Sequence, residues 1–331
     1  MAESKGQFKW PPIGQERAAD FLEKSLLSGK LAQTYIFAGC RDLGKASLAL
    51  AFARNLWRQD RGQGEGDDNF ESLNSDLYIL EKELDKKQIG VEQAREFTKN
   101  LSLSSFFNSY KIGIVKDADI LSSEAQNALL KTLEEPRPKV VIILLVEEIS
   151  SLLATIASRS QILYFYPVST ASVYDYLLAT TDINRSLAKE LSAASLGRPL
   201  QAKQWAENPT AYRERSDLVR SLFDFLKAGL TDRLTFINQI GSGGIISVEA
   251  AEQWLDVLES LWRDALLVSL NQENRLQYSS LLPEWPSLLG ERVELAGSAI
   301  LDRLQKIRQA RAYLLAFVNP KNVLESLAIY F

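Results

Sequence analysis

Histidine is absent from this chain of 331 residues, and cysteine occurs only once, at Cys40. Without histidine the commonest general base and metal ligand is missing, so Ser-His-Asp and Cys-His catalysis are excluded. One cysteine excludes an internal disulfide framework and a cysteine-rich zinc site. Apolar runs stay shorter than the roughly 20 residues of a membrane-spanning helix, and the polar amino terminus has no signal-peptide pattern. We therefore expect a cytoplasmic protein that does not enter a membrane.

The charge balance is mildly acidic, with 38 Lys and Arg residues against 42 Asp and Glu residues and a formal net charge of −4. Surfaces that capture DNA phosphates are built from clustered basic side chains, so direct DNA binding is disfavoured, although a local basic patch stays open. Hydrophobic residues make up 46% of the sequence, which suffices for the cores of two or three domains.

Residues 111–135 combine a strand, an acidic turn and a helix. The apolar run over 112–115 is typical of a buried parallel strand, and it stops at Lys116, Asp117 and Asp119. These side chains fall at the carboxyl end of the strand, which is the edge where open α/β sheets hold ligands. The pattern therefore predicts a P-loop-type α/β sheet with charged groups at its functional edge.

The helix after this turn is expected to begin with a capping box of Ser123 and Gln126 and to be closed by Pro136. Further strands are expected over 32–38, 76–80 and 140–146.

A glycine-rich loop, Gly-Cys-Arg-Asp-Leu-Gly-Lys-Ala-Ser over residues 39–47, lies between the strand at 32–38 and a helix. That is the context of a Walker A phosphate loop. Gly39, Gly44 and Lys45 keep its register, in which backbone N–H groups surround phosphates and the lysine neutralises them. The loop predicts the architecture of a nucleotide site. An exposed lysine at a helix start is the alternative interpretation of Lys45.

The magnesium position of this loop has lost its hydroxyl. Ala46 stands there, and a methyl group cannot ligate a cation that takes only oxygen. Ser47 comes one residue late, about 100° around the helix. Asp42 adds a carboxylate inside the loop, which works against polyphosphate binding. These changes predict a loop without magnesium chemistry.

Two segments resemble the bacterial clamp-loader ATPase-type subunits, which load the sliding clamp of the replicative DNA polymerase. They are Ala-Asp-Ile-Leu at 118–121 and Asn-Ala-Leu-Leu-Lys-Thr-Leu-Glu-Glu-Pro at 127–136. The resemblance implies an α/β P-loop (AAA+) domain with a parallel sheet, then a small helical lid and an all-α collar. The implied domains are 1–166, an AAA+ RecA-like P-loop domain with a degenerate nucleotide site; 167–210, the lid; and 211–331, the collar through which subunits assemble. The collar's expected apolar stripe is Trp254, Leu258, Leu261 and Trp262.

The resemblance also identifies a degenerate Walker B segment. Lys116 and Asp117 stand where hydrolysing relatives have the aspartate that positions magnesium and the glutamate that polarises water. Lysine cannot ligate magnesium, and aspartate is one carbon shorter than glutamate, so a water would be poorly aimed. Glu147 and Glu148 follow a further strand, where two carboxylates would disfavour a triphosphate. For Asp117 and Asp119, a turn-and-cap role is the alternative.

The segment Ser158-Arg159-Ser160 resembles the family's Ser-Arg-Cys motif. The resemblance implies that Arg159, with Ser158 beside it, acts in trans as an arginine finger in the ATP site of a neighbouring subunit. A solvated surface arginine is the alternative. Relatives often carry a four-cysteine zinc module near the polar, glycine-rich stretch 58–75. That module is missing here, so no zinc and no other metal is expected.

Within the family the chain is most similar to the delta-prime subunits, which hydrolyse nothing themselves. The implied partners are the gamma or tau and delta subunits in a hetero-oligomeric ring, and indirectly the sliding clamp and primer-template DNA of the DNA polymerase III holoenzyme. No cofactor is expected beyond passive nucleotide binding. One alternative is an ATP-hydrolysing gamma/tau-type motor subunit, which would need a magnesium oxygen from Ser47 or Asp117. Another is a standalone AAA+-like module that contacts DNA directly.

Overall fold

The computed structural model describes residues 8–11, 13–61, 76–83, 86, 88–105, 109–134, 137–239, 246–289 and 297–331. Contacts divide the chain into two compact units. One comprises residues 1–180 with 197–201, and the other comprises residues 181–196 with 202–331. The finer division into three domains stays a prediction.

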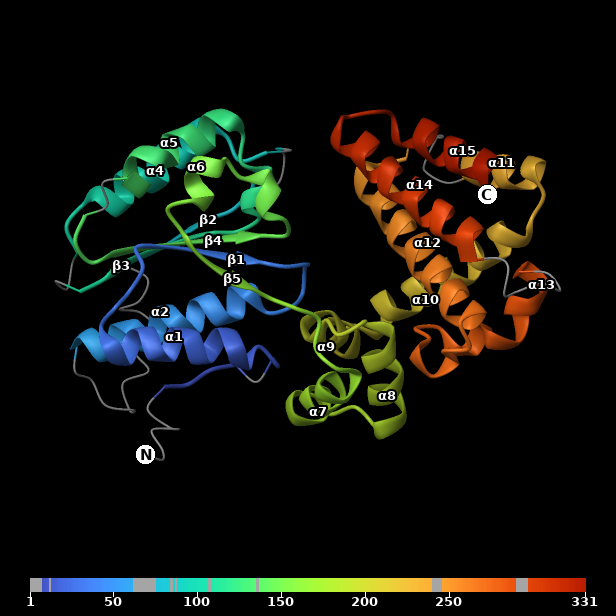
Figure 1. The fold of residues 1–331 in the computed structure, drawn as a ribbon, viewed down its shortest axis with the longest axis horizontal. Helices are drawn as coiled ribbons and strands as arrows, with labels where there is room; N and C mark the ends of the chain where they lie inside the picture. Colours follow the sequence, from blue (N-terminus) through green and yellow to red (C-terminus); the bar gives the residue numbers. More distant parts are fainter. Residues whose placement is uncertain are drawn as a thin grey trace. The chain divides into compact units, whose positions relative to one another are not determined.

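The first unit contains a parallel five-stranded sheet in the order β2-β3-β4-β1-β5 (Figure 1). Four strands lie where the apolar runs predicted them. The apolar run Ile-Leu-Tyr-Phe-Tyr over 162–166 was not predicted as a strand, and its first part lies in β5, a four-residue edge strand that exposes Gln161 and Tyr164. The strands are β1 Thr34–Ala38, β2 Leu77–Leu80, β3 Lys111–Val115, β4 Val140–Val146 and β5 Gln161–Tyr164.

Helices cover both faces of this sheet, as Figure 1 shows. Alternate side chains of β1 divide between two hydrophobic clusters, because successive residues of a strand point to opposite faces. Tyr35 and Phe37 pack with the first two helices, whereas Ile36 packs with α4 and α5. The covering elements are α1 Glu16–Ser28, α2 Lys45–Arg61, α4 Val91–Ser102, α5 Ser123–Glu134 and α6 Ala154–Ala157, with the 3₁₀ turns η1 Ala118–Ile120 and η2 Ile149–Ser151.

The start of α5 differs in detail from the prediction. The capping hydroxyl belongs to Ser122, whose Oγ accepts the Ala125 N–H at 3.1 Å, and not to Ser123. Gln126 does not complete a capping box. Its side chain instead donates to Ser151 O at 3.0 Å and accepts the Leu153 N–H at 2.8 Å. The predicted stop at Pro136 lies outside the described residues.

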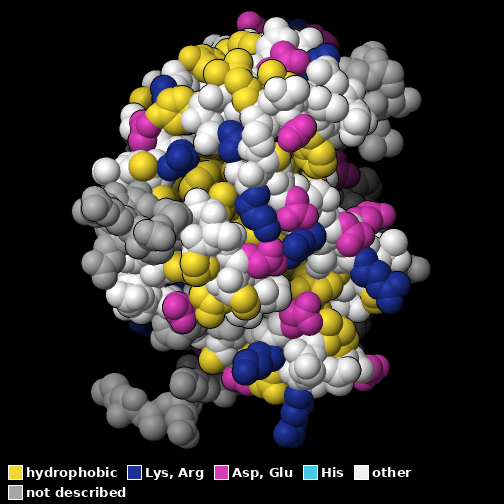
Figure 2. Space-filling model, turned by 90° about the vertical axis from the view of Figure 1, so that its right-hand side faces the viewer, with side chains coloured by type: hydrophobic (Ala, Val, Ile, Leu, Met, Phe, Trp, Pro, Cys, Tyr) yellow, Lys and Arg dark blue, Asp and Glu magenta, His cyan; other side chains and the backbone are white. Residues whose placement is uncertain are grey.

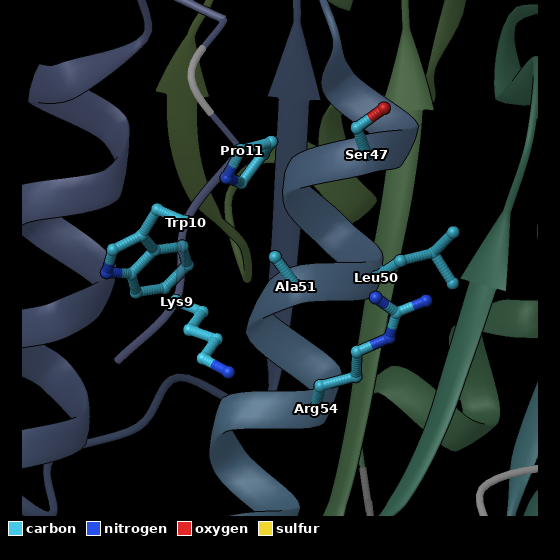
Figure 3. Close-up of a pocket in the computed structure, with 7 residues that line it drawn as sticks. All are labelled: Lys9, Trp10, Pro11, Ser47, Leu50, Ala51 and Arg54. Carbon is cyan, nitrogen blue, oxygen red and sulfur yellow. The ribbon is translucent and has the colours of Figure 1, made fainter. Parts of the chain in front are cut away.

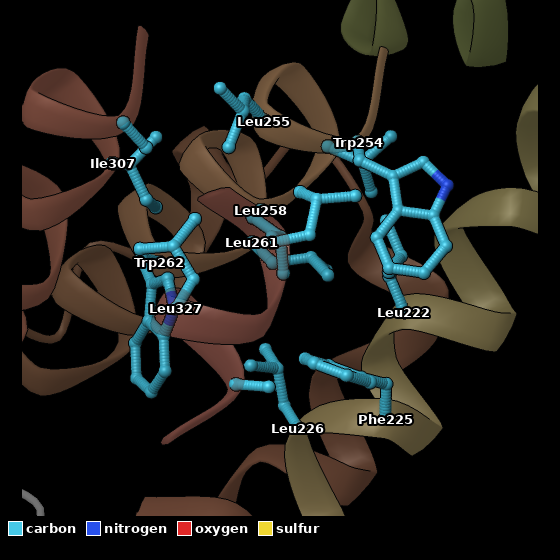
Figure 4. Close-up of a cluster of buried hydrophobic side chains, with 14 of the residues drawn as sticks. Leu222, Phe225, Leu226, Trp254, Leu255, Leu258, Leu261, Trp262, Ile307 and Leu327 are labelled. Carbon is cyan, nitrogen blue, oxygen red and sulfur yellow. The ribbon is translucent and has the colours of Figure 1, made fainter. Parts of the chain in front are cut away.

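The remainder of the chain is helical. Its central helix, α12, buries the predicted stripe of Trp254, Leu258, Leu261 and Trp262 against α10, α14 and α15 (Figure 4). None of the helices in the described ranges combines the length and apolar character needed to cross a membrane. The helices are α7 Thr170–Thr180, α8 Arg185–Ala194, α9 Pro199–Glu207, α10 Pro209–Lys227, α11 Leu230–Gln239, α12 Val248–Ser269, α13 Trp285–Leu289, α14 Gly297–Leu315 and α15 Pro320–Tyr330, with 3₁₀ turns at η4 Glu273–Arg275 and η5 Ser279–Glu284.

Candidate functional site: the phosphate loop and Arg159

The phosphate loop keeps the backbone form that its glycines allow. Gly39 has a φ of +150°, and a Cβ there would lie 2.3 Å from Phe165 O. Gly44 has a φ of +86°, and its Cβ would lie 2.1 Å from Ile13 Cδ1. Side chains are rarely accommodated at positive φ and have no room here in either position. Close packing therefore explains both glycines without any appeal to a ligand.

Lys45 turns back onto its own loop. Its Nζ donates to Gly39 O and, at 3.0 Å, to Cys40 O. Burial lowers the pKa of the Lys45 ammonium, and the negative charges of Glu147 and Asp119 oppose that effect. The ammonium that would neutralise a phosphate is thus occupied by two carbonyl groups of the loop.

Ser47 faces away from the loop, as its place in the sequence predicted. It lines a cavity of about 380 Å³ between the amino-terminal segment and the outer side of α2 (Figure 3). The cavity is also lined by Lys9, Trp10, Pro11, Leu50, Ala51 and Arg54. Ala46, at the magnesium position, packs against the hydrophobic cluster beneath α1 and α2. Neither residue 46 nor residue 47 therefore brings a hydroxyl group to the phosphate loop.

An ion pair links the phosphate loop to the end of β4. Arg41 Nε lies 2.5 Å from Glu147 Oε1, and both side chains are largely exposed. The Asp42 carbonyl accepts the Leu200 N–H at 3.1 Å, which joins the loop to the first turn of α9. Asp42 itself has a φ of +62°. The chain's own groups thus fasten the loop on two sides.

The residues predicted to form a degenerate Walker B segment have local partners. Lys116 Nζ lies 2.8 Å from Glu81 Oε2, and Asp117 adopts a left-handed conformation with a φ of +49° where η1 begins. Asp119 accepts the Glu147 N–H at 2.9 Å and the Ser151 hydroxyl at 2.9 Å. This pattern is that of a turn and a cap. Within the described residues, His, Cys, Asp and Glu side chains nowhere gather in a set of three or more suited to a metal ion.

Arg159 lies at the opposite edge of the sheet from the phosphate loop. It comes just before β5, whose first residue, Gln161, pairs with Tyr35 near the start of β1, whereas the loop leaves the far end of β1. At a rise of about 3.3 Å per residue, the four residues from Tyr35 to Gly39 span roughly 13 Å. Arg159 therefore cannot serve the loop of its own chain without a large rearrangement.

The Arg159 side chain is half exposed and weakly held. Its guanidinium donates to Thr155 O at 3.1 Å and lies 3.2 Å from Glu134 Oε1, and 43% of the side-chain surface is accessible. Ser158 Oγ donates to Thr155 O at 3.1 Å, and Ser160 Oγ donates to Ile156 O at 2.7 Å. The two serines thus fix the turn that presents the arginine.

The loop, the Walker B segment and Arg159 thus fall into two groups. The structure brings Gly39, Gly44, Lys45, Lys116 and Asp117 to one edge of the sheet and leaves Ser158 and Arg159 at the other. Sequence reasoning missed two partners at the first edge. These are Arg41, paired with Glu147, and Glu81, paired with Lys116. Charge complementarity was the only available signal for both, and it does not identify a partner far along the chain.

Comparison with known proteins finds subunits of bacterial DNA polymerase III. Residues 14–169 match the family model described as "DNA polymerase III, delta subunit". The chain is 25% identical over 321 residues to the Bacillus subtilis DNA polymerase III subunit delta′, with 95% of each chain covered. It is 34% identical over 141 residues to Escherichia coli subunit delta′, covering 41% of this chain and 42% of that protein. Against E. coli subunit tau the identity is 26% over 326 residues, covering 92% of this chain and 46% of that protein.

A parallel sheet with a glycine loop after β1, followed by a helical unit, defines a P-loop protein of the AAA+ class. The chain is similar to the bacterial DNA polymerase III delta′ subunits, over 95% of its length for that of Bacillus subtilis.

Proposed function

We propose that this chain is the non-hydrolysing delta′ subunit of a clamp loader and that it lends Arg159 to the ATP site of a neighbouring subunit. One observation carries the proposal. At one edge of the sheet the chain's own groups occupy the phosphate loop, while at the other edge Arg159 stands half exposed. A chain organised in this way has little use for its own nucleotide site but can act on another.

The arginine's surroundings suit that role. A guanidinium stays charged and matches the charge spread over a transferring phosphoryl group. Glu134, its one ionic partner in the described part of the chain, is itself 47% exposed. An exposed ion pair of this kind is worth only about 0–1 kcal/mol, so a triphosphate could replace the carboxylate at little cost.

The partners follow from the same proposal. A neighbour whose ATP site receives Arg159 would be a gamma or tau ATPase subunit, and a delta subunit would complete the ring. The helical unit from 211 onward, with its own buried core, would act as the collar of the assembly. Sliding clamp and primer-template DNA would be engaged through the whole complex in the cytoplasm. Passive nucleotide binding and zinc form no part of the proposed function.

The test is reconstitution of the chain with gamma or tau and delta subunits. We expect Arg159→Ala to leave assembly by size exclusion unchanged and to slow ATP hydrolysis by the complex. At the one ATP site that Arg159 enters, the rate of hydrolysis should fall by about 10³-fold or more, which is the effect associated with a trans-acting arginine. Arg137→Ala is the matched control, because Arg137 is exposed near the same edge. Equal hydrolysis rates for the Arg159→Ala and wild-type complexes would remove the finger from the proposal.

A further inference from the structure

The cavity between the amino-terminal segment and α2 has walls that the chain holds in place. Asn55, a buried residue of α2, donates from Nδ2 to Lys9 O at 3.1 Å and accepts the Lys9 N–H at 3.4 Å. Trp10 Nε1 donates to Glu23 Oε2, on α1, at 2.8 Å. The segment is thus fastened to both helices, and the cavity is a preformed feature of the fold.

One helical stripe of α2 forms the first wall of the cavity. Ser47, Leu50, Ala51 and Arg54 recur at intervals of three and four residues, which places them on the same side of the helix. The facing wall consists of residues 9–11. The two walls together enclose about 380 Å³, which lies within the range of small-molecule sites, roughly 300–1,000 Å³.

Two cations lie toward the same end of this cavity. Figure 3 shows Lys9 and Arg54 on facing walls at that end, whereas Ser47 stands toward the other. Acidic and basic side chains are mixed on the surface toward α11 and α13, as Figure 2 shows, but none of the described residues that line the cavity is acidic. An ammonium has three N–H donors and a guanidinium five, so both groups can take up a carboxylate in addition to their other contacts.

The middle of the cavity suits a flat apolar group. Trp10 and Pro11 offer rings on one wall, and Ala51, on α2, is small enough to leave space beside them. Apart from the two cations, Ser47 Oγ is the one polar side-chain atom that the described lining offers, because the indole N–H is bonded to Glu23. The base and ribose of a nucleotide would lose water there without gaining partners, whereas a plain ring would not.

We propose that this cavity binds a small aromatic carboxylate. Its ring lies between Trp10 and the apolar part of the α2 stripe, and its carboxylate lies between Lys9 and Arg54. Ser47 faces away from the phosphate loop, so this site is distinct from the degenerate nucleotide site. The inference depends on the cavity alone and not on the proposed function.

The test is a ligand-detected NMR titration of the full chain with indole-3-acetate. A probe of this size should bind with a dissociation constant of about 1 mM or lower. Indole-3-acetamide has nearly the same shape but no charge, and we expect it to bind about tenfold more weakly. Deoxyadenosine monophosphate, which carries a ring and an anion but also many polar groups, should bind more weakly than indole-3-acetate.

Variants of the two walls locate the bound probe. Ala51→Phe should fill the cavity and abolish binding, and the double variant Lys9→Met with Arg54→Met should raise the dissociation constant about fivefold or more. Lys24→Met is the matched control, because Lys24 is an exposed residue of α1 outside the lining, and it should leave the affinity unchanged. Circular dichroism of each variant confirms that it is folded.

Four results would overturn the site. They are no binding of indole-3-acetate by the wild type up to about 10 mM, equal binding by Ala51→Phe, equal binding of the acetamide, and tighter binding of the nucleotide. If Ala51→Phe does not fold, unchanged affinity in the double variant decides against the site in its place. Because ATP hydrolysis by the reconstituted complex tests Arg159 separately, either proposal can fail without the other.

Discussion

Arg41 and Glu147, 106 residues apart in the sequence, form an ion pair of 2.5 Å between the phosphate loop and the end of β4. Glu147 also gives its backbone N–H to Asp119, so the pair is tied to the turn after β3. The carboxylate stands at the edge of the sheet where a nucleotide's phosphates would lie. Its negative charge would disfavour them and its arginine partner is already engaged.

Restoring the magnesium hydroxyl should not restore catalysis. We expect both the wild-type chain and Ala46→Thr to show no magnesium-dependent ATP hydrolysis, because Lys116 pairs with Glu81 where a metal carboxylate is needed. A coupled-enzyme phosphate assay on the purified chain measures this, with a gamma or tau subunit as the positive control. Turnover near ~1 per second by the wild type would identify the chain as a motor subunit instead.

Magnesium-ATP should not stabilise the isolated chain. A ligand at 100 times its dissociation constant adds about 2.7 kcal/mol to the free energy of unfolding, which thermal denaturation detects readily. Because Lys45 is bonded to Gly39 O and Cys40 O, and Arg41 to Glu147, we expect no shift in the thermal midpoint at millimolar ATP. A concentration-dependent rise would show that nucleotide displaces these contacts.

The glycines of the phosphate loop should matter for folding. Gly44→Ala combines a left-handed backbone with a collision at Ile13, whereas Gly29→Ala has the same kind of backbone, with a φ of +66°, and open space around its Cβ. We expect Gly29→Ala to cost about 1 kcal/mol and Gly44→Ala about 2–4 kcal/mol in urea denaturation. Equal costs for the two variants would show that Ile13 moves aside freely.

Asp264 should give the helical unit a pH-dependent stability. Its buried carboxylate accepts the Gln277 N–H at 3.0 Å and the Tyr278 N–H at 2.8 Å, so Asp264→Asn should cost about 1–3 kcal/mol. Burial raises the pKa of this carboxyl above its ordinary 3.8, so the folded chain holds the proton more tightly than the unfolded chain. The protonated Asp264 carboxyl therefore stabilises the folded chain. This stabilisation is complete below pH 3.8 and is lost as the pH rises through the raised pKa of the folded state.

The stability difference between wild type and Asp264→Asn should therefore narrow as the pH rises from 3.8 through that window. Urea denaturation followed by tryptophan fluorescence measures it. A difference that widens with rising pH would contradict the raised pKa.

The sequence predicted the inner strands of the sheet better than the edge strand β5. Buried parallel strands such as Val140–Val146 are continuous apolar runs, which a single sequence displays. Edge strand β5 was missed because it is only four residues long and begins with the polar Gln161, although an apolar run over 162–166 marks its place. At the site, the altered positions Ala46 and Lys116 could be recognised from motif spacing alone. The partners that engage the loop could not, because side-chain pairing across the sheet depends on the folded structure.

The separation of the phosphate loop and Arg159 to opposite ends of the strands has a consequence for any ring that contains this chain. Under the proposed function, such a subunit gives assistance on one flank and needs none on the other. Its Arg159 therefore acts on the ATP site of the neighbour on one side, and its own phosphate loop receives no arginine from the neighbour on the other side. The ATPase subunits of such a ring would therefore all face the same way, and the series of active ATP sites would begin at the subunit that receives Arg159.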